Sequence, residues 1–198
     1  MKRKHNMRNE KHTPESNGRT SQSEIFGSNG NATVAMLERV AELISTQNYE
    51  KAVSVLATAG QSPEVQNARG VCLLRLGRHD DAVRLFRGLV LQSGGMWPKA
   101  GVPEVYKSNF ATALLLDGHP GGCLEILASI TDEVFPPKQR LRAAIKKWEK
   151  SLSLWQRFNW WLGRIEPANR PVTIDFDPGD LEGEIAVHSP AVQPLVRS

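Results

Sequence analysis

The central part of the chain places apolar residues at intervals of three and four, which is the spacing of an amphipathic helix. In the first such stretch, Met36, Val40, Leu43 and Ile44 fall on one helical face. A short polar break follows, and a second apolar stretch begins at Tyr49. The pattern predicts two helices joined by a tight turn.

This two-helix unit recurs twice, and both later copies open with Pro-Glu-Val, at Pro63 and at Pro103. Five positions repeat between these copies at a constant offset of 41 residues. They include small residues, leucines and the glycine of the turn, so the offset indicates an internal repeat. The paired positions are Gly70 with Ala111, Leu73 with Leu114, Gly77 with Gly118, Ala82 with Cys123, and Phe86 with Leu127.

This order of small, apolar and turn residues resembles the tetratricopeptide repeat (TPR), a unit of about 34 residues that folds as two antiparallel helices. The resemblance covers about three repeats over roughly residues 32–131. It implies that small residues let paired helices approach closely, while large residues fill the space between them. The first repeat departs from the pattern, because Val40 replaces the small residue and Gln47 replaces the turn glycine.

The repeats are unevenly spaced. Ala52 and Ala82, at equivalent positions of the first two repeats, are only 30 residues apart. Before the third repeat, the stretch QSGGMWPKAGV (residues 92–102) inserts a loop marked by glycines and Pro98. An inserted loop of a solenoid commonly lies at one edge. It is either a tolerated surface insertion or part of a binding surface.

A different pattern follows Pro136 and Pro137, because neither Gly nor Pro interrupts residues 138–162. One face is apolar throughout, and after residue 151 Phe158 and Trp161 make the helix apolar nearly all round. The spacing predicts one long helix. Three interpretations remain open: a cap on the end of the solenoid, a membrane-surface or partner helix, and a nucleic-acid-binding helix.

A capping helix of this kind needs a second segment to cover its other apolar face. Residues 170–181, RPVTIDFDPGDL, alternate apolar and polar side chains, which predicts an extended segment suited to this role. Its acidic residues are expected to face the basic side chains of the helix: Asp175, Asp177 and Asp180.

The balance of basic and acidic residues changes sign near the boundaries of these segments. The net charge is +4, yet residues 138–164 hold eight basic residues against one acid, and residues 165–198 hold two against six. Residues 1–31 are basic and poor in apolar residues, which is typical of disorder. We therefore expect a disordered basic tail (1–31), three TPR-like helix pairs (32–131), a Trp-rich basic capping helix (132–164) and an acidic extended tail (165–198).

The sequence contains no pattern typical of an enzyme. We find no metal-ligand spacing and no Gly-rich phosphate loop, so no metal or cofactor is expected. Cys72 and Cys123 occupy positions where small buried residues belong. No apolar run approaches the ~20 residues of a transmembrane helix, and the N-terminus lacks the apolar region of a secretory signal. The chain also has only two cysteines, which is typical of a reducing compartment. These features predict a cytoplasmic protein.

The fold predicted is therefore an all-α antiparallel helix-pair solenoid with a long C-terminal capping helix and disordered or extended tails. The resemblance implies a non-catalytic scaffold that binds a peptide or protein segment in the concave groove lined by the first helix of each pair. The alternative is a basic module that binds nucleic acid or an anionic membrane surface through residues 138–164. The groove residues predicted are Asn67, Val71, Leu74, Arg75, Ser108, Asn109, Thr112 and Leu115.

Some members of the family hold a peptide's terminal carboxylate with Lys, Asn and Arg side chains. Asn109 and the pair Lys138 and Arg142 resemble part of that set. Glu64 and Ala68 stand where Lys and Asn are required, so no such clamp is predicted.

Overall fold

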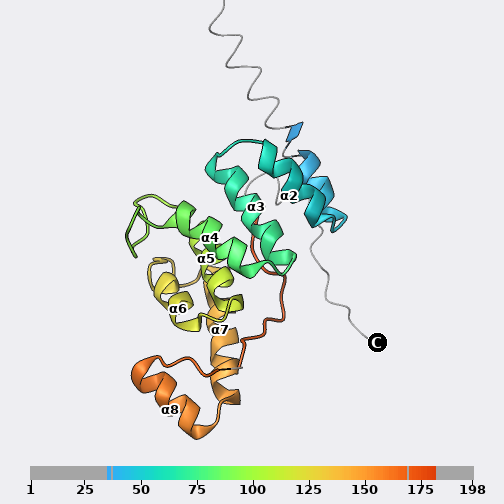
Figure 1. The fold of residues 1–198 in the computed structure, drawn as a ribbon. Helices are drawn as coiled ribbons and strands as arrows, with labels where there is room; N and C mark the ends of the chain where they lie inside the picture. Colours follow the sequence, from blue (N-terminus) through green and yellow to red (C-terminus); the bar gives the residue numbers. More distant parts are fainter. Residues whose placement is uncertain (1–34, 37, 169, 182–198) are drawn as a thin grey trace, which may run out of the picture.

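A computed structural model of the chain describes residues 35–181 except 37 and 169. Within this range the structure is helical apart from loops and one isolated bridge between Leu91 and Pro98 (Figure 1). Helical residues 38–45 precede the labelled helices. These are α2 (Tyr49–Thr58), α3 (Pro63–Arg75), α4 (His79–Val90), α5 (Glu104–Leu116), α6 (Pro120–Ala128), α7 (Pro136–Ser151) and α8 (Leu154–Gly163).

Helices adjacent in the sequence are adjacent in space. Helix α3 packs against α2 and α4, and α5 packs against α4 and α6. The first helices of successive pairs, α3 and α5, also contact one another, and α7 continues the row against α5. The predicted all-α helix-pair solenoid is therefore confirmed.

The turn inside each pair has the same main-chain geometry. Its central residue has positive φ in all three pairs: 58° at Gln47, 73° at Gly77 and 88° at Gly118. In each turn this residue donates its N–H to the carbonyl three positions earlier, and the next N–H reaches the carbonyl five positions earlier. The turn of the first pair thus has the same conformation as the two glycine turns, although its central residue is Gln47. Positive φ costs a non-glycine residue about 1–2 kcal/mol of stability.

Close helix packing explains the small residue of the repeat. A Cβ atom added to Gly70 of α3 would lie 2.4 Å from Cζ of Phe86 in α4, so only glycine fits there. At the equivalent positions of the third pair, Ala111 and Leu127 are both fully buried. In the second pair, the small residue of one helix therefore makes room for the large residue of the next.

The single helix expected over residues 138–162 is wrong, because α7 and α8 are separate helices. Leu152 has extended ψ of 146°, and Ser153 caps α8 by accepting from the N–H of Gln156. The side chain of Gln156 accepts in turn from the N–H of Ser153, at 3.1 Å. This reciprocal capping box starts a new helix without any Gly or Pro.

After α8 the chain returns past α7 toward α3 as an extended segment (Figure 1). We call residues 170–181 the strap. Val172 of the strap joins the main hydrophobic core, and three further side chains pack on it. The strap covers α7 but leaves the outer face of α8 exposed, so the expectation that it covers the whole tryptophan-rich region is wrong for α8. The three strap side chains that pack on the core beside Val172 are Ile174, Phe176 and Leu181.

Candidate functional site

The strap crosses one side of the solenoid, which we call the inner face. This face is formed by α3 and α5, on which the sequence predicts a groove, together with α7, which continues their row. Arg75 of α3, Asn109 of α5 and Arg140 of α7 all donate hydrogen bonds to the strap. The inner face is thus occupied by an extended segment of the same chain.

Asn109 holds the strap by its main chain. Its amide Nδ2 donates to the carbonyl of Asp180, and its Oδ1 accepts from the N–H of Asp180, both at 2.8 Å. The same Nδ2 donates to Oδ1 of Asn67, also at 2.8 Å. Both asparagines are buried, so these bonds satisfy polar groups that would otherwise be costly. Asn109 thus recognises the backbone of the strap at this position and makes no use of the Asp180 side chain.

The residue before Asp180 is selected by shape. Gly179 has a φ of +80°, and a Cβ added there would lie 3.1 Å from Cγ2 of Val71 and 3.2 Å from Cδ1 of Leu74. Positive φ disfavours other residues, and the apolar wall leaves little room for a side chain. The inner face therefore accepts glycine best at this position.

Positive charge surrounds the end of the strap. Nη2 of Arg140 lies 2.8 Å from each carboxylate oxygen of Asp180, and Arg140 also stacks on the ring of Phe176 at 5.1 Å. Arg75 donates to the carbonyls of Pro178 and Gly179 at 3.5 and 3.4 Å. The inner face thus matches an acidic segment that carries an aromatic residue.

The predicted ion pairs between strap and helix are found in part. Asp180 pairs with Arg140, and Asp175 lies 3.5 Å from Nζ of Lys147. Asp177 is exposed and has no ion pair within the described residues. At the other end of the strap, the indole N–H of Trp148 donates to the carbonyl of Arg170 at 2.8 Å.

Five of the eight predicted groove residues lie at or beside the strap. Val71, Leu74, Arg75 and Asn109 contact it, and Asn67 supports Asn109 from behind. The other three belong to the interior: Ser108 donates to the carbonyl of Val105, Thr112 donates to the carbonyl of Ser108, and Leu115 is in the core.

Arg140 and Trp148 are strap contacts that the groove prediction omitted. The groove was placed on the first helices of the repeats alone, whereas α7 continues their row. The only sequence signal for Arg140 was its place opposite the apolar face of the helix, together with the acidic residues of the strap.

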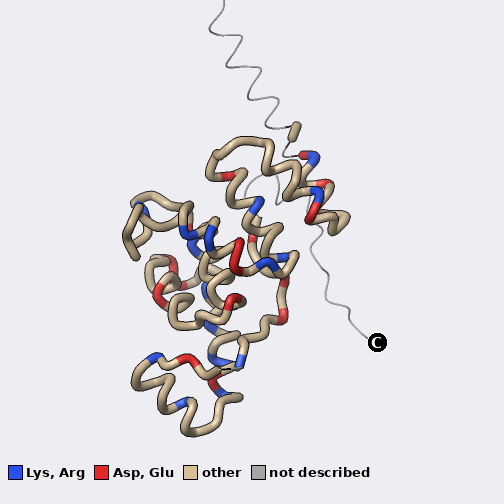
Figure 2. Tube along the Cα trace, in the orientation of Figure 1, with Lys and Arg blue, Asp and Glu red and all other residues tan. Residues whose placement is uncertain are grey.

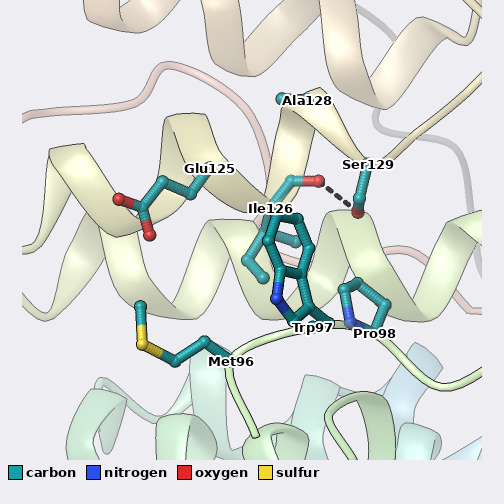
Figure 3. Close-up of a pocket in the computed structure, with 7 residues that line it drawn as sticks. All are labelled: Met96, Trp97, Pro98, Glu125, Ile126, Ala128 and Ser129. Atoms are coloured by element: carbon teal, nitrogen blue, oxygen red, sulfur yellow. Dashed lines mark hydrogen bonds between the residues drawn. The ribbon is translucent and has the colours of Figure 1, made fainter.

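The inserted loop forms a second surface feature. The bridge between Leu91 and Pro98 closes it, and the carbonyl of Trp97 accepts from the N–H of Gln92 at 3.0 Å. Met96 and Trp97 are exposed and border a cavity of about 420 Å³ against α6 (Figure 3). Two polar residues line this cavity. The hydroxyl of Ser129 donates to the carbonyl of Ile126, and Glu125 is the one ionisable residue of the lining. The loop thus provides an apolar surface without converging polar groups.

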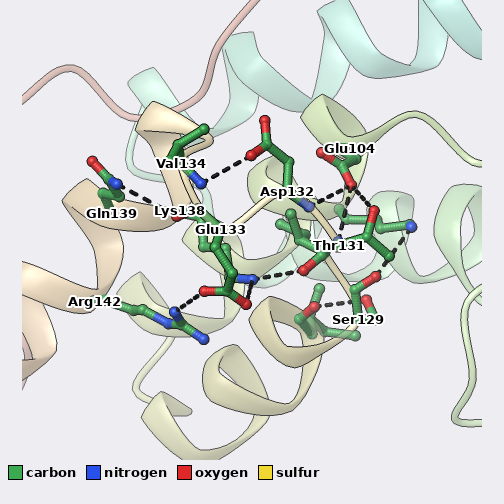
Figure 4. Close-up of polar contacts among 12 residues, drawn as sticks. Glu104, Ser129, Thr131, Asp132, Glu133, Val134, Lys138, Gln139 and Arg142 are labelled. Carbon is green, nitrogen blue, oxygen red and sulfur yellow. Dashed lines mark hydrogen bonds and ion pairs between the residues drawn. The ribbon is translucent and has the colours of Figure 1, made fainter.

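The pair Lys138 and Arg142 binds a side chain of the protein itself. Lys138 is fully buried and donates to Glu133 at 2.7 Å and to the carbonyl of Ile130 at 2.6 Å, while Arg142 meets the other oxygen of Glu133 at 2.6 Å (Figure 4). The hydrogen bond from Lys138, with that from Arg142, holds the pKa of Glu133 below its usual value. The pair anchors the start of α7 and is not free to hold a peptide carboxylate.

The two thiols are inert by their surroundings. Burial raises the pKa of Cys72 to about 12, and burial also raises the pKa of Cys123. A thiol is a nucleophile as the thiolate, which neither group forms at neutral pH.

Residues 35–181, as far as the structure describes them, contain no cluster of three metal-ligating side chains. In the same part of the chain, no helix combines the length and the apolar character needed to cross a bilayer.

The chain was compared with family models, with curated proteins and with solved structures, and none of the three comparisons found a match.

Proposed function

We propose that the protein is a non-catalytic scaffold of TPR-like helix pairs that binds an extended acidic segment of a partner protein on its inner face. In the free chain the strap occupies that face and competes with the partner. The observation that carries the proposal is the pairing of Asn109 with both main-chain groups of Asp180, at 2.8 Å each.

Main-chain pairing of this kind supports a peptide site because any extended segment offers the same N–H and C=O groups. A bond that reads the backbone fixes register and direction, and neighbouring side chains then select the sequence. Here the selection comes from the space beside Gly179 and from Arg140 against the carboxylate of Asp180. A matching partner carries glycine followed by an acidic residue.

The repeat family is part of the proposal. Three successive turns share the same positive-φ geometry and hydrogen bonds, and Gly70 meets Phe86 where the repeat pattern requires close packing. These features support three TPR-like repeats, which commonly present a concave binding surface.

The test uses a labelled peptide with the sequence of residues 170–181 as the probe. The tethered strap has an effective concentration in the millimolar range, so the unmodified chain is expected to bind this peptide weakly. A full-length chain carrying Gly179→Ala and Asp180→Asn has a weakened strap and is expected to bind the peptide more tightly and saturably in fluorescence anisotropy.

Two matched controls decide the outcome. Adding Asn109→Ala to the weakened chain removes the main-chain pairing and is expected to abolish binding. A peptide of scrambled sequence keeps the charge but loses the Gly-Asp step, and it is expected not to bind. Equal binding by the scrambled peptide, or full binding without Asn109, contradicts the proposal.

A further inference from the structure

Helix α8 presents an apolar face that the rest of the described chain leaves uncovered. Its members are half exposed or more, from 50% at Phe158 to 83% at Leu154. Five of them, spaced at one, four, seven and eight residues from Leu154, lie along one side of the helix, and Ile165 is the second residue after its end. We call this set the α8 face: Leu154, Trp155, Phe158, Trp161, Leu162 and Ile165.

The helix that carries this face is firmly attached to α7 by its opposite side. Trp160 is buried, packs edge-on against Trp148 at 5.2 Å between ring centroids, and donates to Glu149 at 2.7 Å. Arg157 donates to the last carbonyls of α7, those of Glu149 and Lys150, at 3.1 and 3.0 Å. The α8 face therefore lies on a helix that is attached to α7 by its opposite side.

Basic side chains occur on α8 and on the second half of α7, and Arg157 lines the same hollow as Leu154, Phe158 and Trp161. Figure 2 shows basic positions of the chain along α7 and α8, and four of the residues there are exposed: Lys146, Lys150, Arg157 and Arg164. Two acids lie in the same region: Glu149 accepts from the indole N–H of Trp160, and Glu166 accepts from the N–H of Gly121 at 3.1 Å, and both carboxylates keep their charge because these donors are neutral. Residues 146–166 hold five Lys or Arg against these two acids, so this part of the chain keeps a net charge of +3.

We propose that the α8 face docks on the surface of an anionic lipid bilayer, a function beyond the peptide binding of the inner face. Tryptophan, phenylalanine and leucine enter the boundary between headgroups and acyl chains, while Lys and Arg stay at the level of the lipid phosphates. The α8 face combines these residue types on one side of a helix with cations at its border.

Other occupants fit the same observations less well. A second copy packing symmetrically through this face brings the same patch from both chains together, so the basic borders of the two copies repel. Nucleic acid offers phosphates and stacking bases, but it gives no matching partner for the aliphatic Leu154, Leu162 and Ile165.

The experiment uses the full chain and sedimentation with vesicles of phosphatidylcholine, alone or mixed with phosphatidylserine. The chain is expected to sediment with the mixed vesicles and to show a blue shift of tryptophan emission. Binding is expected to weaken about fivefold for each Lys or Arg neutralised, which the double variant Lys146→Gln/Lys150→Gln measures.

The decisive variant is Trp155→Ser/Phe158→Ser/Trp161→Ser, which keeps every charge of the chain. Its side chains are exposed, so folding is expected to be unchanged and is checked by circular dichroism. We expect vesicle binding to fall at least a hundredfold, because each aromatic ring contributes about tenfold or more. The matched control is Met96→Ser/Trp97→Ser, which removes equally exposed apolar side chains elsewhere and is expected to bind as the unmodified chain does.

Four results overturn the proposal. They are an absence of binding to the mixed vesicles, equal binding to phosphatidylcholine alone, unchanged binding by the triple serine variant, and a dimer in sedimentation velocity that this variant dissociates. Binding of a single-stranded oligonucleotide that is lost in the triple variant, without vesicle binding, assigns the face to nucleic acid instead.

Discussion

Replacing Gly179 with alanine weakens the attachment of the strap in two ways. The residue has a φ of +80°, where a non-glycine residue costs about 1–2 kcal/mol. The new Cβ also lies 3.1–3.2 Å from Val71 and Leu74, so these side chains shift by a few tenths of an ångström. We expect a combined loss of about 2 kcal/mol in strap attachment, which is about a thirtyfold change in its opening equilibrium.

Hydrogen exchange of the Asp180 amide measures this equilibrium, because that N–H donates to Asn109 in the attached strap. Its exchange rate is expected to rise about thirtyfold in Gly179→Ala. The control is Gly101→Ala, at a φ of +75° with no atom within 4 Å of the new Cβ. This control has the same backbone cost elsewhere and leaves Asp180 protected. An unchanged rate at Asp180 in Gly179→Ala refutes the reasoning.

Four further substitutions test the remaining contacts. Asn109→Ala leaves buried polar groups unpaired and is expected to lower the free energy of unfolding by about 1–3 kcal/mol in urea titrations. Gly70→Ala forces a Cβ against Phe86 and is expected to cost about 1–3 kcal/mol, partly recovered in the double variant with Phe86→Leu. Gln47→Gly relieves positive φ and is expected to raise the melting temperature. Glu133 has a folded-state pKa below its ordinary value of 4.5. The stabilisation that its carboxylate gives is therefore present above pH 4.5 and is lost as the pH falls through the folded-state pKa. We expect Glu133→Gln to be less stable than the unmodified chain at pH 7, and the difference to shrink in acid.

The helix pairs could be predicted from the sequence because their signals are local and repeated. Apolar spacing, the glycines of two turns and the constant offset of 41 residues between the second and third repeats can all be read along the chain. The alignment of Gln47 with the turn glycines was also predicted, but only the backbone reveals that Gln47 keeps their positive φ. Likewise the boundary at Ser153 was missed because a capping box interrupts the helix without a breaking residue.

The inner face was predicted only in part because its occupant is distant in the sequence. Asn109 meets Asp180 across 71 residues, and no periodicity reports a contact of that kind. The strap was expected to lie on the tryptophan-rich helix, and two of its acidic residues, Asp175 and Asp180, do meet α7. Its last residues, however, extend to α5 and α3. The exposed α8 face follows from this path, because a strap that runs along the inner face cannot also cover α8.

The central claim, that the inner face binds extended segments reversibly, is tested most directly by displacing the strap. A label on the full chain carrying Asp177→Cys reports strap mobility, since Asp177 is exposed and both native cysteines are buried. Excess unlabelled peptide of residues 170–181 is expected to release the strap saturably, whereas the same peptide with alanine in place of Gly179 is expected to release it far less. A label that stays immobile at every concentration of either peptide contradicts the claim and makes the strap a permanent part of the fold.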